Sequence, residues 1–320
     1  MRSNKKDYIT RIKANVSIYS TKKTSNILDG SYTSVFMGRS MNFEDLREYI
    51  PGDNIKDIDW KASSRSGGIL VKRFVAEKKH NIMLVMDSGI KMLGDTPKGK
   101  TKKEIALYTA GTIAYLAYKN GDTIGALYSN DGKLEHHPCR TGLVNVEKIL
   151  AYYDAASTNG RNSNLNDTLS FIVNHMKNKM IIFVITDKRG MNSVSDETIK
   201  RLLCRHDLLY VNIGDIGMTD DDLVSEDDAK TSFLSRLFKR DNVDRSTKTY
   251  DLDMDRYIPE FIAENKQLWK LEQEKKREII EENKRKTVKH GIMNVDIDDE
   301  SEIVVKIIEL LEKHKHANIR

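Results

Sequence analysis

The fold of this chain is decided by residues 81–91, which read NIMLVMDSGIK. Residues 82–86 form an uninterrupted apolar run of strand length, and the run ends at the carboxylate of Asp87. Similar runs recur downstream, separated by helical patterns. The predicted strands are residues 82–86, 123–128, 180–185, 208–213 and 292–295, and the predicted helices are residues 101–119, 144–153, 165–177, 194–205, 256–289 and 302–314. This alternation predicts an α/β, Rossmann-like domain with a mostly parallel central sheet and helices on both faces.

The first quarter of the chain has a different character. Residues 1–80 lack long helical periodicity and are rich in turn residues. Two pieces, residues 32–37 and 69–75, are compatible with strands, and a short helix is expected at residues 42–49. We therefore predict a small β-rich N-terminal module at residues 1–80, followed by the α/β domain at residues 81–320.

Composition places the chain among globular proteins, because 39% of its residues are hydrophobic and 32% are charged. The net charge of +5 is concentrated at the start, where residues 1–80 hold 16 Lys and Arg against 9 Asp and Glu. An acidic stretch followed by a short amphipathic piece predicts a surface insertion near residues 217–248. The N-terminus has no apolar secretory leader, no apolar run is long enough to span a membrane, and Cys139 and Cys204 suit free thiols in a reducing compartment. We therefore expect a cytoplasmic protein.

A second informative stretch precedes the first strand, with residues 38–53 reading GRSMNFEDLREYIPGD and residues 58–65 reading IDWKASSR. Pro51, Gly52 and Asp53 favour a turn, because Pro presets φ, Gly permits positive φ and Asp hydrogen-bonds nearby backbone. The whole stretch resembles the signature of the family known as domain of unknown function 58 (DUF58), and the likeness continues into the first predicted strand. This resemblance implies a von Willebrand factor A (vWA) type domain preceded by a small β-rich module.

The charged and aromatic residues of this signature have two interpretations. Opposite charges in a compact module predict a half-buried ionic network that holds the N-terminal module to the sheet, with an indole as its packing surface. The alternative is a partner-binding surface. The signature residues are Arg47, Tyr49, Pro51, Gly52, Asp53, Asp59, Trp60 and Arg65.

The resemblance also implies a metal position whose residues are altered in this chain. A vWA domain often binds Mg²⁺ through D-x-S-x-S after its first strand, a Thr from a second loop and an Asp after a later strand. Here Asp87 is retained, but Gly89 and Lys91 stand where the two serines would be. Ser163 takes the place of the Thr, and Asp187 matches the late Asp.

This altered set predicts a site without a tightly bound metal, because Mg²⁺ demands near-octahedral oxygen ligands. We expect the Lys91 ammonium to reach the carboxylates of Asp87 and Asp187 and to replace the metal charge. The alternative is a weak Mg²⁺ site, with Asp87 and Asp187 as ligands and Ser88 contributing from a shifted loop. The residues proposed for partner binding at this degenerate metal site are Asp87, Ser88, Lys91, Ser163 and Asp187.

Residues 94–101 match the phosphate-loop pattern G-x-x-x-x-G-K-[ST], from Gly94 to Thr101, so an NTP-binding enzyme is the main alternative function. A phosphate loop follows its strand directly, whereas the strand here ends near Asp87. Thr101 and Glu104 fit a capping box for the next helix. The lysines around this loop are then expected to be solvated, and they are Lys98, Lys100, Lys102 and Lys103.

The function expected from these patterns is binding, since no nucleophile elbow or recognisable acid/base pair is present. Members of the DUF58 family are often linked with MoxR-type AAA+ ATPases, so the resemblance implies a non-catalytic adaptor or scaffold for such an ATPase or its client. We expect the partner at the carboxyl edge of the sheet, where ligands bind in open α/β folds. A third class, a nucleic-acid or membrane-surface binder that uses the basic residues 1–80, stays open.

Overall fold

The computed structural model describes most of the chain. The described residues are 8–19, 41–53, 55–76, 79–96, 98–130, 132–159, 163–214, 250–251, 256–257 and 266–317. The predicted strand at residues 32–37 and the predicted insertion near residues 217–248 lie outside the described residues.

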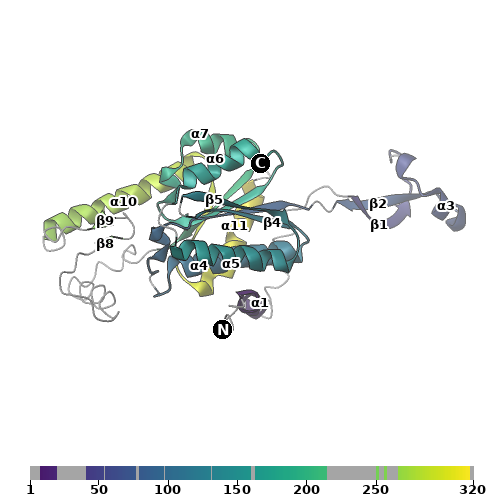
Figure 1. The fold of residues 1–320 in the computed structure, drawn as a ribbon. Coiled ribbons are helices and arrows are strands. Elements are labelled where there is room, and N and C mark those ends of the chain that lie inside the picture. Colours follow the sequence, from purple (N-terminus) through teal and green to yellow (C-terminus); the bar gives the residue numbers. More distant parts are fainter. Residues whose placement is uncertain are drawn as a thin grey trace.

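The centre of the protein is a six-stranded sheet in which all neighbouring strands are parallel except one edge pair (Figure 1). In spatial order the strands are β10 (Met293–Ile297), β7 (Asp207–Ile213), β6 (Ile181–Asp187), β3 (Asn81–Met86), β4 (Thr123–Asn130) and β5 (Lys133–Arg140). Counted along the chain from the β5 edge, this is the order 3-2-1-4-5-6 of a doubly wound fold. The order reverses between β3 and β6. The predicted Rossmann-like, mostly parallel α/β class is therefore confirmed.

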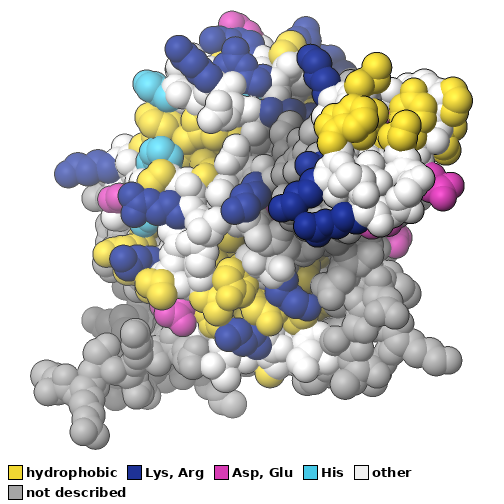
Figure 2. Space-filling model, turned by 90° about the vertical axis from the view of Figure 1, so that its right-hand side faces the viewer, with side chains coloured by type: hydrophobic (Ala, Val, Ile, Leu, Met, Phe, Trp, Pro, Cys, Tyr) yellow, Lys and Arg dark blue, Asp and Glu magenta, His cyan; other side chains and the backbone are white. Residues whose placement is uncertain are grey.

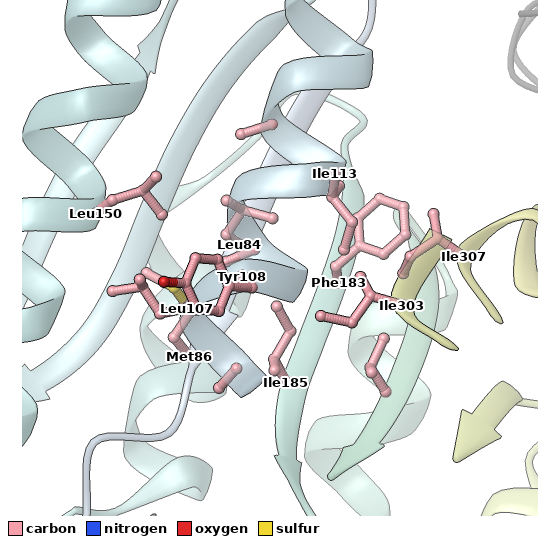
Figure 3. Packing of buried hydrophobic residues seen from close by; sticks show 14 of the residues in the cluster. Leu84, Met86, Leu107, Tyr108, Ile113, Leu150, Phe183, Ile185, Ile303 and Ile307 are labelled. Atoms are coloured by element: carbon pink, nitrogen blue, oxygen red, sulfur yellow. The ribbon is translucent and has the colours of Figure 1, made fainter. Parts of the chain in front are cut away.

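Strand β3 shows why the apolar runs become strands that are buried on both faces. Ile82, Leu84 and Met86 join one apolar cluster, and Met83 and Val85 join the other. One cluster is covered by α1 (Tyr8–Tyr19), α4 (Lys102–Lys119), α5 (Leu143–Asn159) and α11 (Ile303–Ala317), and the other by α6 (Leu165–His175) and α7 (Asp196–Leu203). Figure 3 shows the first cluster, in which Leu84 and Met86 lie near residues of β6, α4 and α11.

The remaining elements are short or lie at the margins. Strand β5 was not predicted, because its edge position leaves most of its side chains exposed and its residues include lysine, glutamate and proline. A long helix, α10 (Lys266–Lys289), contacts the turn η4 (Gly190–Ser193), and two short strands, β8 (Tyr250–Asp251) and β9 (Arg256–Tyr257), pair with each other. No helix within the described residues is both long enough and apolar enough to cross a membrane.

The N-terminal module, predicted to be β-rich, also contains a helix, α1, that the sequence did not predict. Its residues Ile9, Ile12 and Val16 form a buried stripe at helical spacing. A Cβ on Gly111 of α4 would lie 2.2 Å from Cδ1 of Ile12, so the glycine gives α1 room to approach α4. The Arg11 guanidinium pairs with Glu300 of the turn η6 (Glu300–Glu302) at 2.8 Å. Residues that are far apart in the sequence therefore pack together beside the central sheet, and we call the sheet with its covering helices the body.

Residues 41–76 form a separate hairpin arm, which projects from the body in Figure 1. The predicted helix at residues 42–49 is wrong, because this segment is strand β1 (Met41–Glu48), paired antiparallel with β2 (Leu70–Ala76). The predicted strand at residues 69–75 is confirmed as β2. The connection between the strands contains a short turn, η2 (Ile55–Asp57), and the helix α3 (Trp60–Ser66).

The arm also corrects the expected packing of the signature onto the sheet. Trp60 was predicted to be a buried packing surface, but 64% of this residue is exposed. Asp59 instead caps α3, accepting hydrogen bonds from the backbone N–H groups of Lys61 and Ala62 at 3.1 and 3.0 Å. The signature therefore builds the end of an arm.

Candidate functional site

The candidate site lies at the carboxyl ends of β3 and β6, where the strand order reverses. Asp87 follows β3 directly, and Asp187 is the last residue of β6. Two buried tyrosines hold these residues by their backbones. The Tyr153 hydroxyl donates to the carbonyl of Asp87 at 2.6 Å, and the Tyr210 hydroxyl donates to the carbonyl of Asp187 at 2.7 Å. Burial raises the pKa of both tyrosines, so they remain neutral donors.

The ammonium of Lys91 lies between the two carboxylates. Its Nζ is 2.8 Å from Oδ2 of Asp87 and 3.2 Å from Oδ1 of Asp187. The lysine comes from the turn η3 (Ile90–Leu93), whose Met92 is fully buried and anchors the turn. The prediction that Lys91 reaches both carboxylates is confirmed. A quarter of the Lys91 side chain (25%) remains exposed.

Arg189 is a second cation at the site, and the sequence analysis missed it. Its guanidinium lies 3.2 Å from Oδ2 of Asp187, and its backbone N–H donates to Oδ1 of the same residue at 3.2 Å. The signal for it is weak, because a basic residue two positions after a strand is common on protein surfaces. Two cations and two carboxylates therefore balance in charge, and we call Asp87, Lys91, Asp187 and Arg189 the edge cluster.

Asp87 has further hydrogen-bond donors from neighbouring segments. Thr186 donates from its hydroxyl to Oδ2 at 2.5 Å, and the backbone N–H of Gly89 donates to Oδ1 at 3.0 Å. Burial alone would raise the pKa of Asp87, but the Lys91 ammonium and these donors hold it below its usual value. Burial opposes the charged form of Lys91, yet the carboxylates of Asp187 and Asp87 raise its pKa above the ordinary value. Asp87 and Lys91 are therefore both charged at neutral pH.

The two serines of the predicted site differ in position. Ser88 is buried, and its hydroxyl donates to the backbone carbonyl of Ser129 at the end of β4, so it does not join the carboxylates. Ser163 lies beside the cluster, since a Cβ on Gly89 would be 3.0 Å from the Cβ of Ser163 and 3.3 Å from Oδ1 of Asp87. The structure thus brings together four of the five predicted residues, with Asp87 and Asp187 at Lys91 and Ser163 next to Gly89, and directs Ser88 elsewhere.

A surface hollow of about 520 Å³ adjoins the edge cluster at Ser163. It lies between α6 and the residues at the β4–β5 connection. Most of its lining residues have polar side chains, and an aromatic ring and a leucine add apolar surface. The lining residues are Ser129, Gly132, Leu134, Ser163, Asn164, Asp167, Thr168, Ser170, Phe171 and Asn174.

The loop of residues 94–101 is closed by its own hydrogen bonds. The N–H of Gly94 donates to the carbonyl of Lys91 at 3.3 Å, and that of Thr96 donates to Lys100 at 2.6 Å. The N–H of Gly99 donates to the carbonyl of Thr96 at 2.9 Å. The predicted capping box of Thr101 and Glu104 is confirmed.

The lysines of this region are less solvated than predicted. Lys102 is fully buried, and Lys103 pairs with Asp154 of α5 at 2.8 Å. Lys100 pairs with Glu300, the residue that also binds Arg11 of α1. The prediction of a solvated basic loop is therefore wrong for Lys102, which is buried, and for Lys100 and Lys103, which pair with acidic residues of other elements.

The signature residues form two separate pairs where one network was predicted. Arg47 and Asp53 lie 2.6 Å apart, and Lys72 pairs with Asp59 at 3.5 Å. Arg65 is exposed on α3 and joins neither pair. The turn expected from Pro51 to Asp53 is present: Gly52 has a φ of 110°, the N–H of Asp53 donates to Ile50 at 3.0 Å, and that of Tyr49 donates to Ile69 at 2.9 Å.

Comparison with known proteins places these features in a wider group. A family model described as “Protein of unknown function DUF58” matches residues 45–226. Uncharacterised proteins of Mycobacterium bovis and Mycobacterium tuberculosis are each 26% identical over 129 residues, which are 40% of this chain. The chain spans 40% of the length of these curated relatives.

The solved structures that match this chain share little sequence with it. A conserved hypothetical protein, BatB from Bacteroides thetaiotaomicron, is 11% identical with a TM-score of 0.41, and the match covers 74% of this chain and 99% of that one. A von Willebrand factor type A protein from Catenulispora acidiphila is 13% identical with a TM-score of 0.30, covering 45% of this chain and 35% of that one.

Proposed function

Because this chain belongs to the DUF58 family, a family of unknown function, we propose from its own chemistry that it is a non-catalytic adaptor that binds a protein partner at the carboxyl edge of its sheet. The observation that carries the proposal is the position of Lys91 between Asp87 and Asp187. It supplies, from the chain itself, the positive charge that a metal would otherwise bring to two carboxylates. Each ionisable group of this edge cluster is engaged with another, which suits a rigid docking edge better than proton transfer.

The proposed partner contacts are the exposed part of Lys91 and the adjoining hollow. An acidic side chain of the partner would meet the Lys91 ammonium, and the polar wall at Ser163 would take the neighbouring residues. The partner suggested by the family resemblance is a MoxR-type AAA+ ATPase or its client. We further propose that no metal ion takes part and that the protein acts in the cytoplasm.

Capture of the partner from native lysate, with and without EDTA, tests the metal-free part of the proposal. We expect equal capture in both conditions. We also expect Mg²⁺ to leave the melting temperature unchanged, because a ligand without a site contributes no linkage free energy. Loss of the partner in EDTA, or a melting temperature that rises with Mg²⁺, would contradict the proposal.

The docking edge itself is tested by blocking the hollow. Ser163→Arg places a long side chain at the point where the hollow meets the edge cluster, and it should abolish capture. Ala151→Arg, at an exposed position of α5 that does not line the hollow, is the matched control and should retain the partner. Equal capture by both variants would move the contact to another surface.

The alternative of an NTP-binding enzyme at residues 94–101 has less support. Three N–H groups of that loop donate to carbonyls within residues 91–100, whereas a phosphate loop directs such groups at its ligand. Bound ATP at a hundred times its dissociation constant would add about 2.7 kcal/mol of stability. We expect no ATP-dependent rise in melting temperature, and a rise that Lys100→Ala removes would favour the enzyme.

A further inference from the structure

Four large hydrophobic side chains are exposed together at the end of the arm. They are Ile50 (60% exposed), Ile55 (66%), Trp60 (64%) and Ile69 (47%). All four belong to the 49–69 connection between β1 and β2, which we call the arm tip. The other exposed large hydrophobics of the described residues are scattered over β5 and several helices. Figure 2 looks toward this side of the molecule and shows hydrophobic side chains gathered at its upper right, with lysine and arginine side chains nearby.

The arm tip is a structured surface. The N–H of Tyr49 donates to the carbonyl of Ile69 at 2.9 Å, which holds the two ends of the tip together. The N–H of Asp59 donates to Leu70 at 2.9 Å, and the buried Ile58 bridges to Val71 of β2. The connection is thus folded against its own hairpin, and the four exposed side chains are left outside that contact.

The charges around the arm tip favour an anionic partner. Of the three carboxylates of the tip, Asp53 and Asp59 are paired with Arg47 and Lys72 of the hairpin strands, and the third, Asp57, is next to Lys56 in the sequence. The helix α3 adds two exposed cations, Lys61 and Arg65, for which the described residues provide no ion pair.

The size and chemistry of the patch decide between possible partners. If each of the four side chains buries about 150 Å², the low end for an aromatic ring, the patch removes about 600 Å² from water. A stable protein interface needs about 800 Å² per partner, so a second copy of this chain gains too little from the tip alone. Nucleic-acid bases stack on aromatic rings, whereas three of the four side chains here are isoleucines.

We propose that the arm tip inserts shallowly into a lipid surface that carries anionic headgroups. Isoleucine side chains enter the acyl boundary, the Trp60 indole lies at the headgroup level, and Lys61 and Arg65 face the phosphates. The projection of the arm brings this patch to a membrane ahead of the body (Figure 1). This role is independent of the partner site at the carboxyl edge of the sheet, which lies on other elements.

Co-sedimentation of the full chain with vesicles tests the proposal. We expect binding to phosphatidylcholine vesicles that contain phosphatidylserine, weaker binding to phosphatidylcholine alone, and a loss of binding at high salt. The double variant Ile55→Asn with Trp60→Ala should weaken binding by roughly tenfold or more. The double variant Lys61→Gln with Arg65→Gln should weaken binding roughly tenfold, and only to the phosphatidylserine-containing vesicles.

The matched control is Tyr152→Ala, which removes an equally exposed aromatic residue (58%) from α5 and should bind like the parent. Circular dichroism of each variant confirms that the fold is retained. Absence of vesicle binding by the parent overturns the proposal, as does binding that the tip variants leave unchanged. Self-association that Trp60→Ala abolishes would assign the patch to a second copy of the chain instead.

Discussion

Two regions of this protein combine carboxylates with cations, and they differ in burial. In the edge cluster, Asp87 and Asp187 are almost completely buried and meet Lys91 and Arg189. On the arm, the pairs Arg47–Asp53 and Lys72–Asp59 have side chains that are between 18% and 39% exposed. The distances overlap, since the edge contacts span 2.8 to 3.2 Å and the arm pairs 2.6 and 3.5 Å. Distance alone therefore does not show which of these ion pairs contributes more to stability.

The difference teaches that burial sets the value of an ion pair. Water and salt screen an exposed pair, and each partner is well solvated when the pair is broken. A buried charge that loses its partner has no water to replace it, so the loss is strongly destabilising. The edge cluster should therefore respond strongly to the removal of a cation, and the arm pairs weakly.

The largest expected effect is that of Lys91→Met. It leaves two buried carboxylates without the ammonium between them, and we expect the free energy of unfolding to fall by about 3–5 kcal/mol. Urea denaturation measures this change. The double variant Asp87→Asn with Lys91→Met removes one charge of each sign and should recover part of the loss. If Lys91→Met were as stable as the parent, burial would not explain the difference between the edge cluster and the arm pairs.

Removal of the other edge cation should have an intermediate effect. Arg189→Met removes the guanidinium contact with Asp187 but leaves Lys91 in place, and the backbone N–H of residue 189 still donates to the carboxylate. We expect a loss of about 1.5–3 kcal/mol, the range for hydrogen bonds to charged groups. Urea denaturation beside Lys91→Met shows which cation contributes more. A larger loss of stability in Arg189→Met than in Lys91→Met would show that Arg189 is the more important cation.

The pH dependence of the Lys91→Met variant sharpens the comparison. In the parent, the lowered pKa of Asp87 means that its stabilisation is present above its unfolded pKa and is lost only in stronger acid. Without the ammonium, burial and Asp187 raise the pKa of Asp87 above its unfolded value, so the variant gains stability as the pH falls. The difference in the free energy of unfolding between variant and parent should narrow between about pH 8 and about pH 5. It should narrow by about 1.4 kcal/mol for each pKa unit by which the pKa of Asp87 is raised. A difference that did not depend on pH would show that the carboxylates are solvated in the variant.

The smallest effects are expected on the arm. Trp60→Ala should change the free energy of unfolding by about 0.5 kcal/mol or less, because the indole is exposed. Arg47→Met, the counterpart of Lys91→Met, should leave the unfolding midpoint unchanged. Both are measured by thermal melting of the full chain. A large loss in either variant would mean that the arm packs on another surface in solution.

The sequence predicted the body of this protein well, because buried parallel strands have long apolar runs and α4 has a clear capping box. The resemblance to the vWA metal site also led to the prediction that Lys91 lies between Asp87 and Asp187, and the neighbouring carboxyl ends of β3 and β6 explain why it does. It failed where tertiary burial decides the outcome. Trp60 was expected inside because tryptophan is usually buried, and Lys102 was expected outside because lysine is usually exposed. Strand β5 lacks an apolar run, so pairing with β4 alone defines it.

The docking of α1 has a consequence for the order in which this protein matures on the ribosome. Arg11 and Glu300 are separated by 289 positions, so α1 is synthesised long before the residue that its Arg11 pairs with. Until residue 300 leaves the exit tunnel, the stripe of Ile9, Ile12 and Val16 has only a partial seat on α4. A chain that stalls before residue 300 therefore keeps this apolar stripe partly uncovered, where chaperones can bind it.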